Sequence, residues 1–315
     1  MPKKIIIDTD PGVDDAMAIL LAFQSPEVEV VGLTTVFGNV YTSQATQNAL
    51  RLVELANRPD IPVAHGAELP LVVSLESVAD FVHGADGLGN TNLPPPPGQP
   101  IDRPAAQFMV ETIMAQPGQV TLVSIGPLTN LALALALEPR IAANVAEVVI
   151  MGGAATVNGN VNPAAEANII HDPHAADVVL TASWPVTMVG LDVTLRTVMT
   201  DDYLAGLKDS GELGEFIFDI SRFYRDFHYN FYGLAGLHTH DPSAMAYVIN
   251  PSLFTTERGP IRVITEGLAA GQTLLDRRQV WREANGWSDS PPVNVCLGVD
   301  SRRLLALYKE RIAAG

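Results

Sequence analysis

The sequence predicts an α/β protein in which an open, mostly parallel central sheet is flanked by helices. Short β-branched and apolar runs alternate with helical stretches, which is typical of parallel βαβ units covered on both faces. Hydrophobic residues form 47% of the 315-residue chain and charged residues 17%, so a large core is available and disorder is not expected. Because no stretch resembles a linker, we expect one domain over residues 1–315.

The alternation is clearest in the first two thirds of the chain. Residues 4–8 form a short apolar strand ending in a carboxylate, and residues 14–24 form a helix with Asp14 and Asp15 in its first turn. The pattern continues with a strand at 27–36, an amphipathic helix at 42–57, a buried strand at 119–125, a helix at 126–139, and a strand, helix and strand at 145–151, 171–183 and 185–193. The proline-rich stretch at 94–100 predicts a surface loop.

The last third of the chain departs from this alternation. Residues 200–250 are mainly helical and aromatic, and we expect this region to cap the sheet. Strands return at 260–265 and 293–299, and a helix follows at 300–313. The single cysteine, Cys296, lies in the second of these strands, where a buried thiol is the simplest interpretation.

The formal net charge of −16 argues against two classes of partner. An acidic surface repels polyphosphate and anionic lipid, so we expect neither nucleic-acid polymers nor membranes as partners. A small neutral ligand, or a cation held by carboxylates, remains compatible. A single cysteine, a short N-terminal apolar run and the lack of a membrane-length apolar stretch predict a cytoplasmic protein.

Four carboxylates lie within eight residues directly after the first strand. They belong to Asp8, Asp10, Asp14 and Asp15, and Pro11-Gly12 turns the chain between them. Held close together, they would repel one another unless a hard cation with oxygen ligands is bound. Helix capping explains a pair of aspartates, whereas four around a Pro-Gly turn favour a metal. EF-hand, HExxH zinc and GxxxxGK phosphate motifs are absent from the sequence.

Other polar segments follow the later strands. Asn39 follows the second predicted strand, residues 126–130 follow the strand at 119–125, and an asparagine-rich loop at 156–168 follows the strand at 145–151. Ligands bind beyond the carboxyl ends of parallel strands, so these segments are expected to converge on one site.

These segments belong to longer motifs that resemble those of the inosine-uridine preferring nucleoside hydrolase family. In chain order the motifs are IIIDTDPGVDDAMAI at 5–19, TTVFGNV at 34–40, HGADGLGN at 83–90, GPLTNLALAL at 126–135, VIMGGA at 149–154, NGNVNPAAEANI at 158–169 and HDPSA at 240–244. The resemblance implies a Rossmann-like nucleoside hydrolase fold. It also implies hydrolysis of the N-glycosidic bond of ribonucleosides to free base and ribose.

The resemblance further implies a metal site and a catalytic base. A calcium ion (Ca2+) would be held by Asp10, Asp15, Asp241 and the backbone carbonyl of Ile125. Asp10 would take a proton from a water on the calcium ion, because a bound cation lowers the pKa of water. The reaction passes through an oxocarbenium-like state, which negative groups around the ribose stabilise.

Substrate contacts are implied in the same way. Residues expected at the ribose are Asp14 and Asn168 at the 2′- and 3′-hydroxyls, Asp241 near the 3′-hydroxyl, Asn160 and Glu166 at the 5′-hydroxyl, Asn39 beside the attacking water, and Met151 beneath the sugar. His83 and His240 would lie near the base, and His240 is the first choice for protonating it. Taken singly, each of these residues has an ordinary structural interpretation as a turn, cap, surface or core residue. Their combination favours the site.

The aromatic stretch at 223–233 is harder to interpret. Such a run at helical spacing is usually core or interface. Related proteins use a helix here to contact the nucleobase, so we favour Phe227 and His228 as base contacts, and Tyr224 and Tyr232 less. Base preference stays open, with a lean toward pyrimidine or mixed inosine and uridine specificity. The resemblance also suggests a homotetramer or a homodimer.

Two other functions compete with nucleoside hydrolysis. A haloacid-dehalogenase-type (HAD-like) phosphatase also starts with an apolar strand and Asp-x-Asp, but it needs a later lysine near the phosphate, and neither Lys208 nor Lys309 follows a strand. A non-catalytic nucleoside-binding protein would keep the pocket without turnover. Magnesium-dependent phosphate release would indicate the first alternative, and binding without release of base the second.

Overall fold

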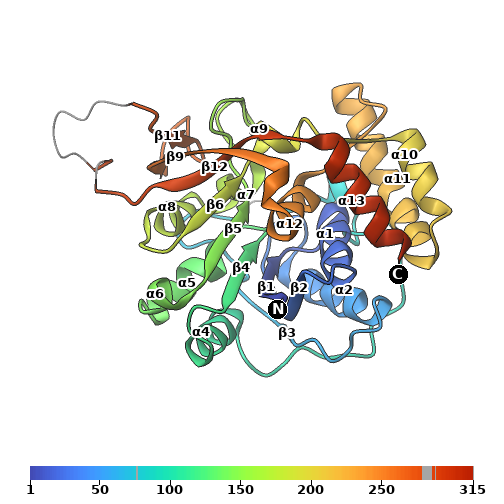
Figure 1. Ribbon diagram of the computed structural model, residues 1–315, viewed down its shortest axis with the longest axis horizontal. Helices are drawn as coiled ribbons and strands as arrows, with labels where there is room; N and C mark the ends of the chain where they lie inside the picture. The colour runs from blue at the N-terminus through green and yellow to red at the C-terminus, as the bar shows by residue number, and fades with distance from the viewer. Residues whose placement is uncertain (76, 279–285, 288, 315) are drawn as a thin grey trace.

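An eight-stranded sheet runs through the molecule, with the first strand of the chain in its interior (Figure 1). The computed structural model describes residues 1–75, 77–278, 286, 287 and 289–314. In spatial order the strands are β3 (Val63–Ala64), β2 (Val28–Thr35), β1 (Lys3–Thr9), β4 (Val120–Ser124), β5 (Glu147–Met151), β6 (Val186–Val189), β12 (Val293–Val299) and β9 (Phe254–Gly259). Neighbouring strands are parallel except for β12 and β9 at one edge. The predicted open, mostly parallel α/β sheet is confirmed.

Helices cover both faces of this sheet, as the β1 side chains require. Ile5 and Ile7 belong to one apolar core and Ile6 to another, and none of the three is exposed. The first core is completed by α1 (Val13–Phe23), α2 (Thr42–Leu55), α11 (Glu212–Tyr232), α12 (His240–Ile249) and α13 (Ser301–Ala313). The second is completed by α4 (Ala105–Ala115), α5 (Thr129–Leu137), α6 (Ile141–Asn144), α7 (Ala167–His171) and α8 (Pro173–Thr181).

The region expected to cap the sheet is only partly a cap. Within it, α12 packs on β5 and β6, whereas α11 packs on α1, α3 (Asp80–His83) and α13 beside the sheet. Figure 1 accordingly shows α10 (Asp201–Lys208) and α11 together at one side of the molecule. The region also contains a strand, β8 (Gly236–His238), which pairs antiparallel with β7 (Val198–Thr200).

The remaining elements are short. They are α9 (Leu191–Thr194), the 3-10 helix η1 (Pro251–Leu253), and the antiparallel pair β10 (Ile261–Val263) and β11 (Thr273–Leu275). The strand predicted at 260–265 is therefore β10, which lies outside the central sheet, while the strand predicted at 293–299 is β12 within it. In the described part of the chain, none of the helices combines the length and apolar character needed to cross a membrane.

The strand order reverses at β1, and this reversal positions the site. β1 pairs with β2 on one side and with β4 on the other. The helix after β1 belongs to the first core and the helix after β4 to the second, so the two connections leave the sheet toward opposite faces. Such a divergence opens a crevice beyond the carboxyl ends of the two strands, where ligands bind in sheets of this type.

Candidate active site

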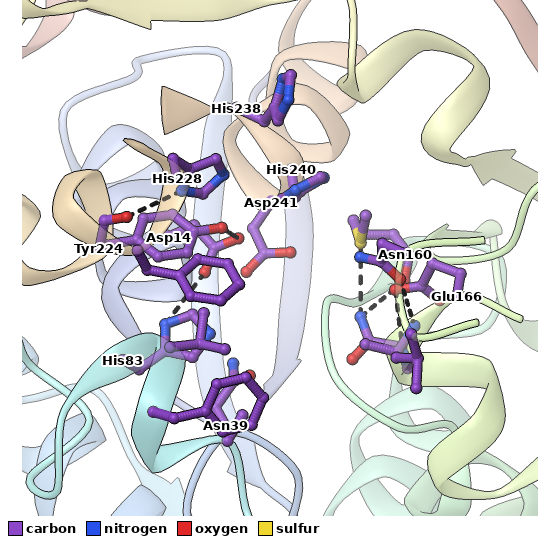
Figure 2. Close-up of a pocket in the computed structure, with 18 of the residues that line it drawn as sticks. Asp14, Asn39, His83, Asn160, Glu166, Tyr224, His228, His238, His240 and Asp241 are labelled. Atoms are coloured by element: carbon purple, nitrogen blue, oxygen red, sulfur yellow. Dashed lines mark hydrogen bonds and ion pairs between the residues drawn. The ribbon is translucent and has the colours of Figure 1, made fainter. Parts of the chain in front are cut away.

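A cavity of about 450 Å³ lies at this crevice. The residues predicted to contact sugar or base all line it, with Ile125: Asp14, Asn39, His83, Met151, Asn160, Glu166, Asn168, Phe227, His228, His240 and Asp241. Figure 2 shows Asp14, His83 and Asp241 on one side of the cavity, with Asn160 and Glu166 facing them. The structure therefore brings residues from widely separated segments of the sequence into one enclosure. Its described lining includes no lysine or arginine, and it does not include the predicted metal ligands Asp10 and Asp15.

Asp15 organises the segment after β1. At the first turn of α1, its carboxylate accepts hydrogen bonds from the Thr9 hydroxyl (2.5 Å), the Gly12 backbone N–H (3.0 Å) and the Asn39 side-chain amide (2.9 Å). An acidic group at a helix N-terminus is stabilised by the unpaired N–H groups there. The Pro-Gly turn is thus fixed by the same carboxylate that was predicted to bind the metal.

The Asp10 carboxylate lies between two glycines. Oδ2 accepts the backbone N–H of Asn39 at 2.6 Å, and buried Oδ1 has no hydrogen-bond partner among the described residues. A Cβ atom at Gly38 would lie 2.0 Å from Oδ2, and one at Gly126 would lie 2.5 Å from Oδ1. The backbone therefore approaches the carboxylate as closely as only glycine permits.

The carboxylates fit a divalent cation. Two of the predicted carboxylate ligands, Asp15 and Asp241, and also Asp14 each place an oxygen within 4.8 Å of the others, and all three residues are buried. Among the described residues, the third predicted carboxylate ligand, Asp10, does not belong to this group of oxygens. Burial and then the neighbouring Asp15 raise the pKa of Asp14 to about 8 and hold the pKa of Asp10 well above its usual range. Buried, mutually repelling oxygens, including the unpaired Oδ1 atoms of Asp10 and Asp14, are the donor set that a hard cation prefers.

The opposite wall presents amides and one carboxylate. Glu166 caps the first turn of α7, accepting N–H groups from Gly153 (2.9 Å), Asn168 (3.0 Å) and Ile169 (3.2 Å). The Asn168 amide donates to the carbonyls of Ile125 (3.0 Å) and Met151 (3.1 Å). Asn168 thus joins the sugar-side loop to the carbonyl that was predicted to be a metal ligand.

Two histidines at the other end of the cavity hold opposite tautomers. His83 Nδ1 accepts the backbone N–H of Val13 at 3.2 Å, and burial lowers the His83 pKa to about 3, so the neutral ring carries its proton on Nε2. His228 Nδ1 lies 2.9 Å from the Tyr224 carbonyl, which can only accept. Burial lowers the His228 pKa to about 4, so this neutral ring carries its proton on Nδ1 and leaves Nε2 as an acceptor.

Two further residues lie at this end of the cavity: Tyr224, which the sequence favoured less as a base contact, and His238, which it did not predict. The Tyr224 hydroxyl lies 3.4 Å from Asp14 Oδ2, and its ring stacks on His83 at 5.0 Å. His238 was not predicted; it lines the cavity, with its ring centroid 5.3 Å from His228 and 5.8 Å from His240. The only sequence signal for it is the spacing His238-Thr239-His240 in β8 and the start of α12, which sends alternate side chains to one side.

His240 is buried beside the metal candidates. Its Nδ1 lies 2.9 Å from the Thr194 hydroxyl, and burial, followed by the other cavity histidines, lowers its pKa well below the usual value. Because either atom of the Thr194 pair can donate, the tautomer of His240 is not fixed by this contact. Five of the seven histidines in the chain line the cavity. Four of them, His83, His228, His238 and His240, lie at this end, whereas His171 belongs to α7 with Asn168.

Comparison with known proteins agrees with the geometry. Residues 5–306 match the family described as inosine-uridine preferring nucleoside hydrolase. A probable uridine nucleosidase of Arabidopsis thaliana is 50% identical, covering 98% of this chain and 97% of the relative. The inosine-uridine preferring nucleoside hydrolase of Leishmania major is 43% identical over 88% of this chain and 89% of its own. A solved plant nucleoside hydrolase superposes with a TM-score of 0.98 at 45% identity, covering 100% of both chains. The chain therefore belongs to the inosine-uridine preferring nucleoside hydrolase family.

Proposed function

We propose that this protein is a calcium-dependent ribonucleoside hydrolase that prefers uridine and inosine. The observation that carries the proposal is a cavity in which buried carboxylates face amides and neutral histidines. In the reaction the C1′–N bond breaks with its electron pair passing to the base, a water oxygen bonds to C1′, and the base gains a proton. Positive charge that develops on the sugar is stabilised by the carboxylates around it.

The ribose is held between the two walls. Asp14 and Asp241 on one wall accept hydrogen bonds from sugar hydroxyls, while Asn160, Glu166 and Asn168 on the other offer both donors and acceptors. A nucleoside lacking a hydroxyl would leave some of these buried groups unpaired, so 2′-deoxyuridine is expected to react far more slowly than uridine.

Asp10 is the base that we assign to activate the water. Oδ2 is held by the Asn39 N–H, and the buried Oδ1, which has no hydrogen-bond partner among the described residues, is the atom that would accept a proton from water. Asp10, Asp15, Asp241 and the Ile125 carbonyl are the groups that would hold calcium. When bound, calcium supplies the positive charge that lowers the pKa of water. His240 remains our first choice for delivering the proton to the leaving base.

The fixed histidine tautomers support a preference among bases. His83 Nε2 is a donor and His228 Nε2 is an acceptor, and both residues line the cavity. Uracil and hypoxanthine present a ring N–H beside a carbonyl, which complements that pair. Cytosine and adenine present an unprotonated ring nitrogen beside an amino group, which reverses the pattern. We therefore place uridine and inosine above cytidine and adenosine.

The phosphatase alternative has little support at this site. Phosphate recognition relies on lysine, arginine or clusters of backbone N–H groups. The described residues lining the cavity include neither cation, and Asp14, Glu166 and Asp241 would repel a phosphate. A non-catalytic nucleoside-binding protein would release no free ribose, so measuring ribose distinguishes it from a hydrolase.

The test is release of free ribose. The protein is incubated with uridine, inosine, cytidine, adenosine and 2′-deoxyuridine, each with calcium or with a chelator, and Asp10→Ala is run beside it. Ribose from uridine and inosine that disappears on prolonged chelation and in Asp10→Ala is the expected result. Binding of uridine without ribose would indicate the non-catalytic alternative. Release from cytidine as fast as from uridine would refute the base preference alone.

A further inference from the structure

Asn48 is a fully buried residue of α2 whose side-chain amide joins two segments of the site. Its Nδ2 donates to the Pro11 carbonyl at 2.9 Å and to the Asp86 carbonyl at 2.8 Å. Pro11 belongs to the carboxylate segment (residues 8–15) and Asp86 to the glycine loop (residues 83–92). Resting on the proposed function, we propose that Asn48 is a positioning residue that sets where His83 stands relative to the carboxylates, and so controls nucleobase recognition.

The orientation of this amide is fixed by its acceptor side. Oδ1 accepts Gln44 Nε2 at 2.9 Å and Arg51 Nη1 at 2.8 Å, so both N–H groups must point to the two loops. Arg51 also donates to the carbonyls of Leu93 (3.2 Å) and Pro94 (3.0 Å), directly after the glycine loop. One face of α2 therefore holds the glycine loop at Asp86 and the chain directly after that loop at Leu93 and Pro94.

The two segments pack closely against Asn48 and against each other. A Cβ atom at Gly87 would lie 2.9 Å from Asn48 Nδ2 and 3.0 Å from the Pro11 carbonyl, and Gly87 has φ +76°. A Cβ atom at Gly12 would lie 2.7 Å from His83 Nδ1. The same Nδ1 accepts the Val13 N–H, so any shift of the glycine loop moves His83 against the start of α1.

We expect the glycine loop, rather than the carboxylate segment, to shift when the Asn48 amide is lost. The carboxylate segment has its own buried hydrogen bonds, from Thr9 and Gly12 to Asp15. The glycine loop is closed mainly on itself, by the Asp86 carboxylate, which accepts three N–H groups within the loop, and several of its residues are exposed. Loss of Asn48 should therefore displace His83 while leaving the carboxylates in place.

Two substrates separate these halves of the site. Uridine needs the histidines at its base, whereas 4-nitrophenyl β-D-ribofuranoside carries the same ribose with a leaving group that departs without protonation. In Asn48→Ala and in Asn48→Asp, which keeps the shape but removes both donors, kcat/KM for uridine should fall about 10- to 100-fold, because displacement of a contact group by about 1 Å costs that much. We expect little change in kcat/KM for the aryl riboside. We also expect little change in the calcium concentration that gives the half-maximal rate.

Two further variants make the result interpretable. Asn294→Ala removes an amide that donates to Thr187 Oγ1 (3.3 Å) and the Tyr247 hydroxyl (3.2 Å), away from the cavity, and should leave the ratio of the two kcat/KM values unchanged. Asp86→Ala removes the carboxylate that accepts three N–H groups within the same loop. It should change the ratio of the two kcat/KM values in the same direction as Asn48→Ala, and it tests the proposal even if the Asn48 variants do not fold.

The possible results separate the two proposals. Equal losses on both substrates in the Asn48 variants, a weakened response to calcium, or an unchanged ratio in Asp86→Ala would overturn the assignment of Asn48. Wild-type protein inactive on both substrates would overturn the proposed function instead.

Discussion

At the scale of single residues, the position of the Asp10 carboxylate depends on the absence of a Cβ atom at the two glycines beside it. Gly126→Ala introduces a Cβ atom 2.5 Å from Oδ1 without requiring a left-handed backbone. We expect kcat for uridine to fall at least about 100-fold, because the displaced carboxylate no longer meets the water. Activity is measured by the release of ribose from uridine, and folding is checked by thermal unfolding.

The matched control for this change is Gly206→Ala in α10. Its Cβ atom would contact only the flexible end of Lys309, at 3.0 Å. Alanine is favoured over glycine inside helices by about 1 kcal/mol, so this variant should be slightly more stable and fully active. Wild-type kcat in Gly126→Ala would show that the Asp10 carboxylate tolerates displacement.

His228 gives a pH dependence that follows from its burial. Burial lowers its pKa in the folded chain to about 4, below the ordinary histidine value of 6.5, so between these pH values the unfolded chain binds more protons. The contribution of His228 is therefore complete above pH 6.5 and is lost as the pH falls toward 4. Between pH 7.5 and pH 5 it amounts to about 2 kcal/mol.

The measurement is urea unfolding of wild type and His228→Gln at both pH values. The fall in the free energy of unfolding between pH 7.5 and pH 5 should be smaller in the variant, and taking this difference removes the contributions of the other titrating groups. An equal fall in both proteins would mean that His228 is already protonated in the fold.

Sequence identifies the type and place of most candidate residues but not their hydrogen bonds. The four clustered aspartates follow a buried strand, and this alone indicates a site. The tautomer of His83 depends on the Val13 N–H, a contact that forms only when α1 and α3 meet, and no local pattern contains that information. The tautomer of His228 depends on the Tyr224 carbonyl, which lies four residues earlier in the same helix, α11.

At the scale of elements, long periodic segments were predicted within a few residues. The helix predicted at 42–57 is Thr42–Leu55, and that at 300–313 is Ser301–Ala313. The edge strand β9 was missed because its four middle residues are all exposed, so it lacks the alternation that marks a strand. The β7–β8 pair was missed because Val198 pairs with His238, far away along the chain.

Asp172 joins three elements, and its loss should weaken all of them. Its buried carboxylate caps α8 at Ala175 N–H (3.0 Å) and accepts the Thr129 hydroxyl of α5 and the Leu71 N–H, both at 2.8 Å. Asp172→Ala should cost about 3 kcal/mol, because a cap and two buried hydrogen bonds are lost.

A second helix cap provides the comparison. Asp300→Ala removes an exposed cap, whose carboxylate accepts the Arg303 N–H at 3.1 Å, and should cost about 1 kcal/mol. Urea midpoints of the two variants measure the difference. Equal midpoints would show that the Thr129 and Leu71 contacts of Asp172 contribute nothing to stability.

At the scale of the whole molecule, metal binding should be visible as stability. An ion that binds only the folded chain stabilises it by about 2.7 kcal/mol when present at 100 times its Kd. Adding calcium to chelator-treated protein should therefore raise Tm, and Asp15→Asn should lose most of that rise. A wild-type Tm that does not respond to calcium would contradict the assignment of the carboxylate site.

The central sheet was predictable as a class, but its strand order was not. Apolar strands alternating with helices require parallel pairing, yet they do not state which strands are neighbours. That β1 lies between β2 and β4 was found only in the structure, and this placement is what opens the crevice.

The long sequence separation between the two sides of the carboxylate site has a consequence for protein synthesis. Asp10, Asp14 and Asp15 are synthesised more than two hundred residues before Asp241. A nascent chain that ends before α12 therefore has the early aspartates without their last partner and without the histidines of β8 and α12. We therefore expect that hydrolysis cannot begin before α12 has been synthesised, and that a chain ending before it does not consume nucleosides.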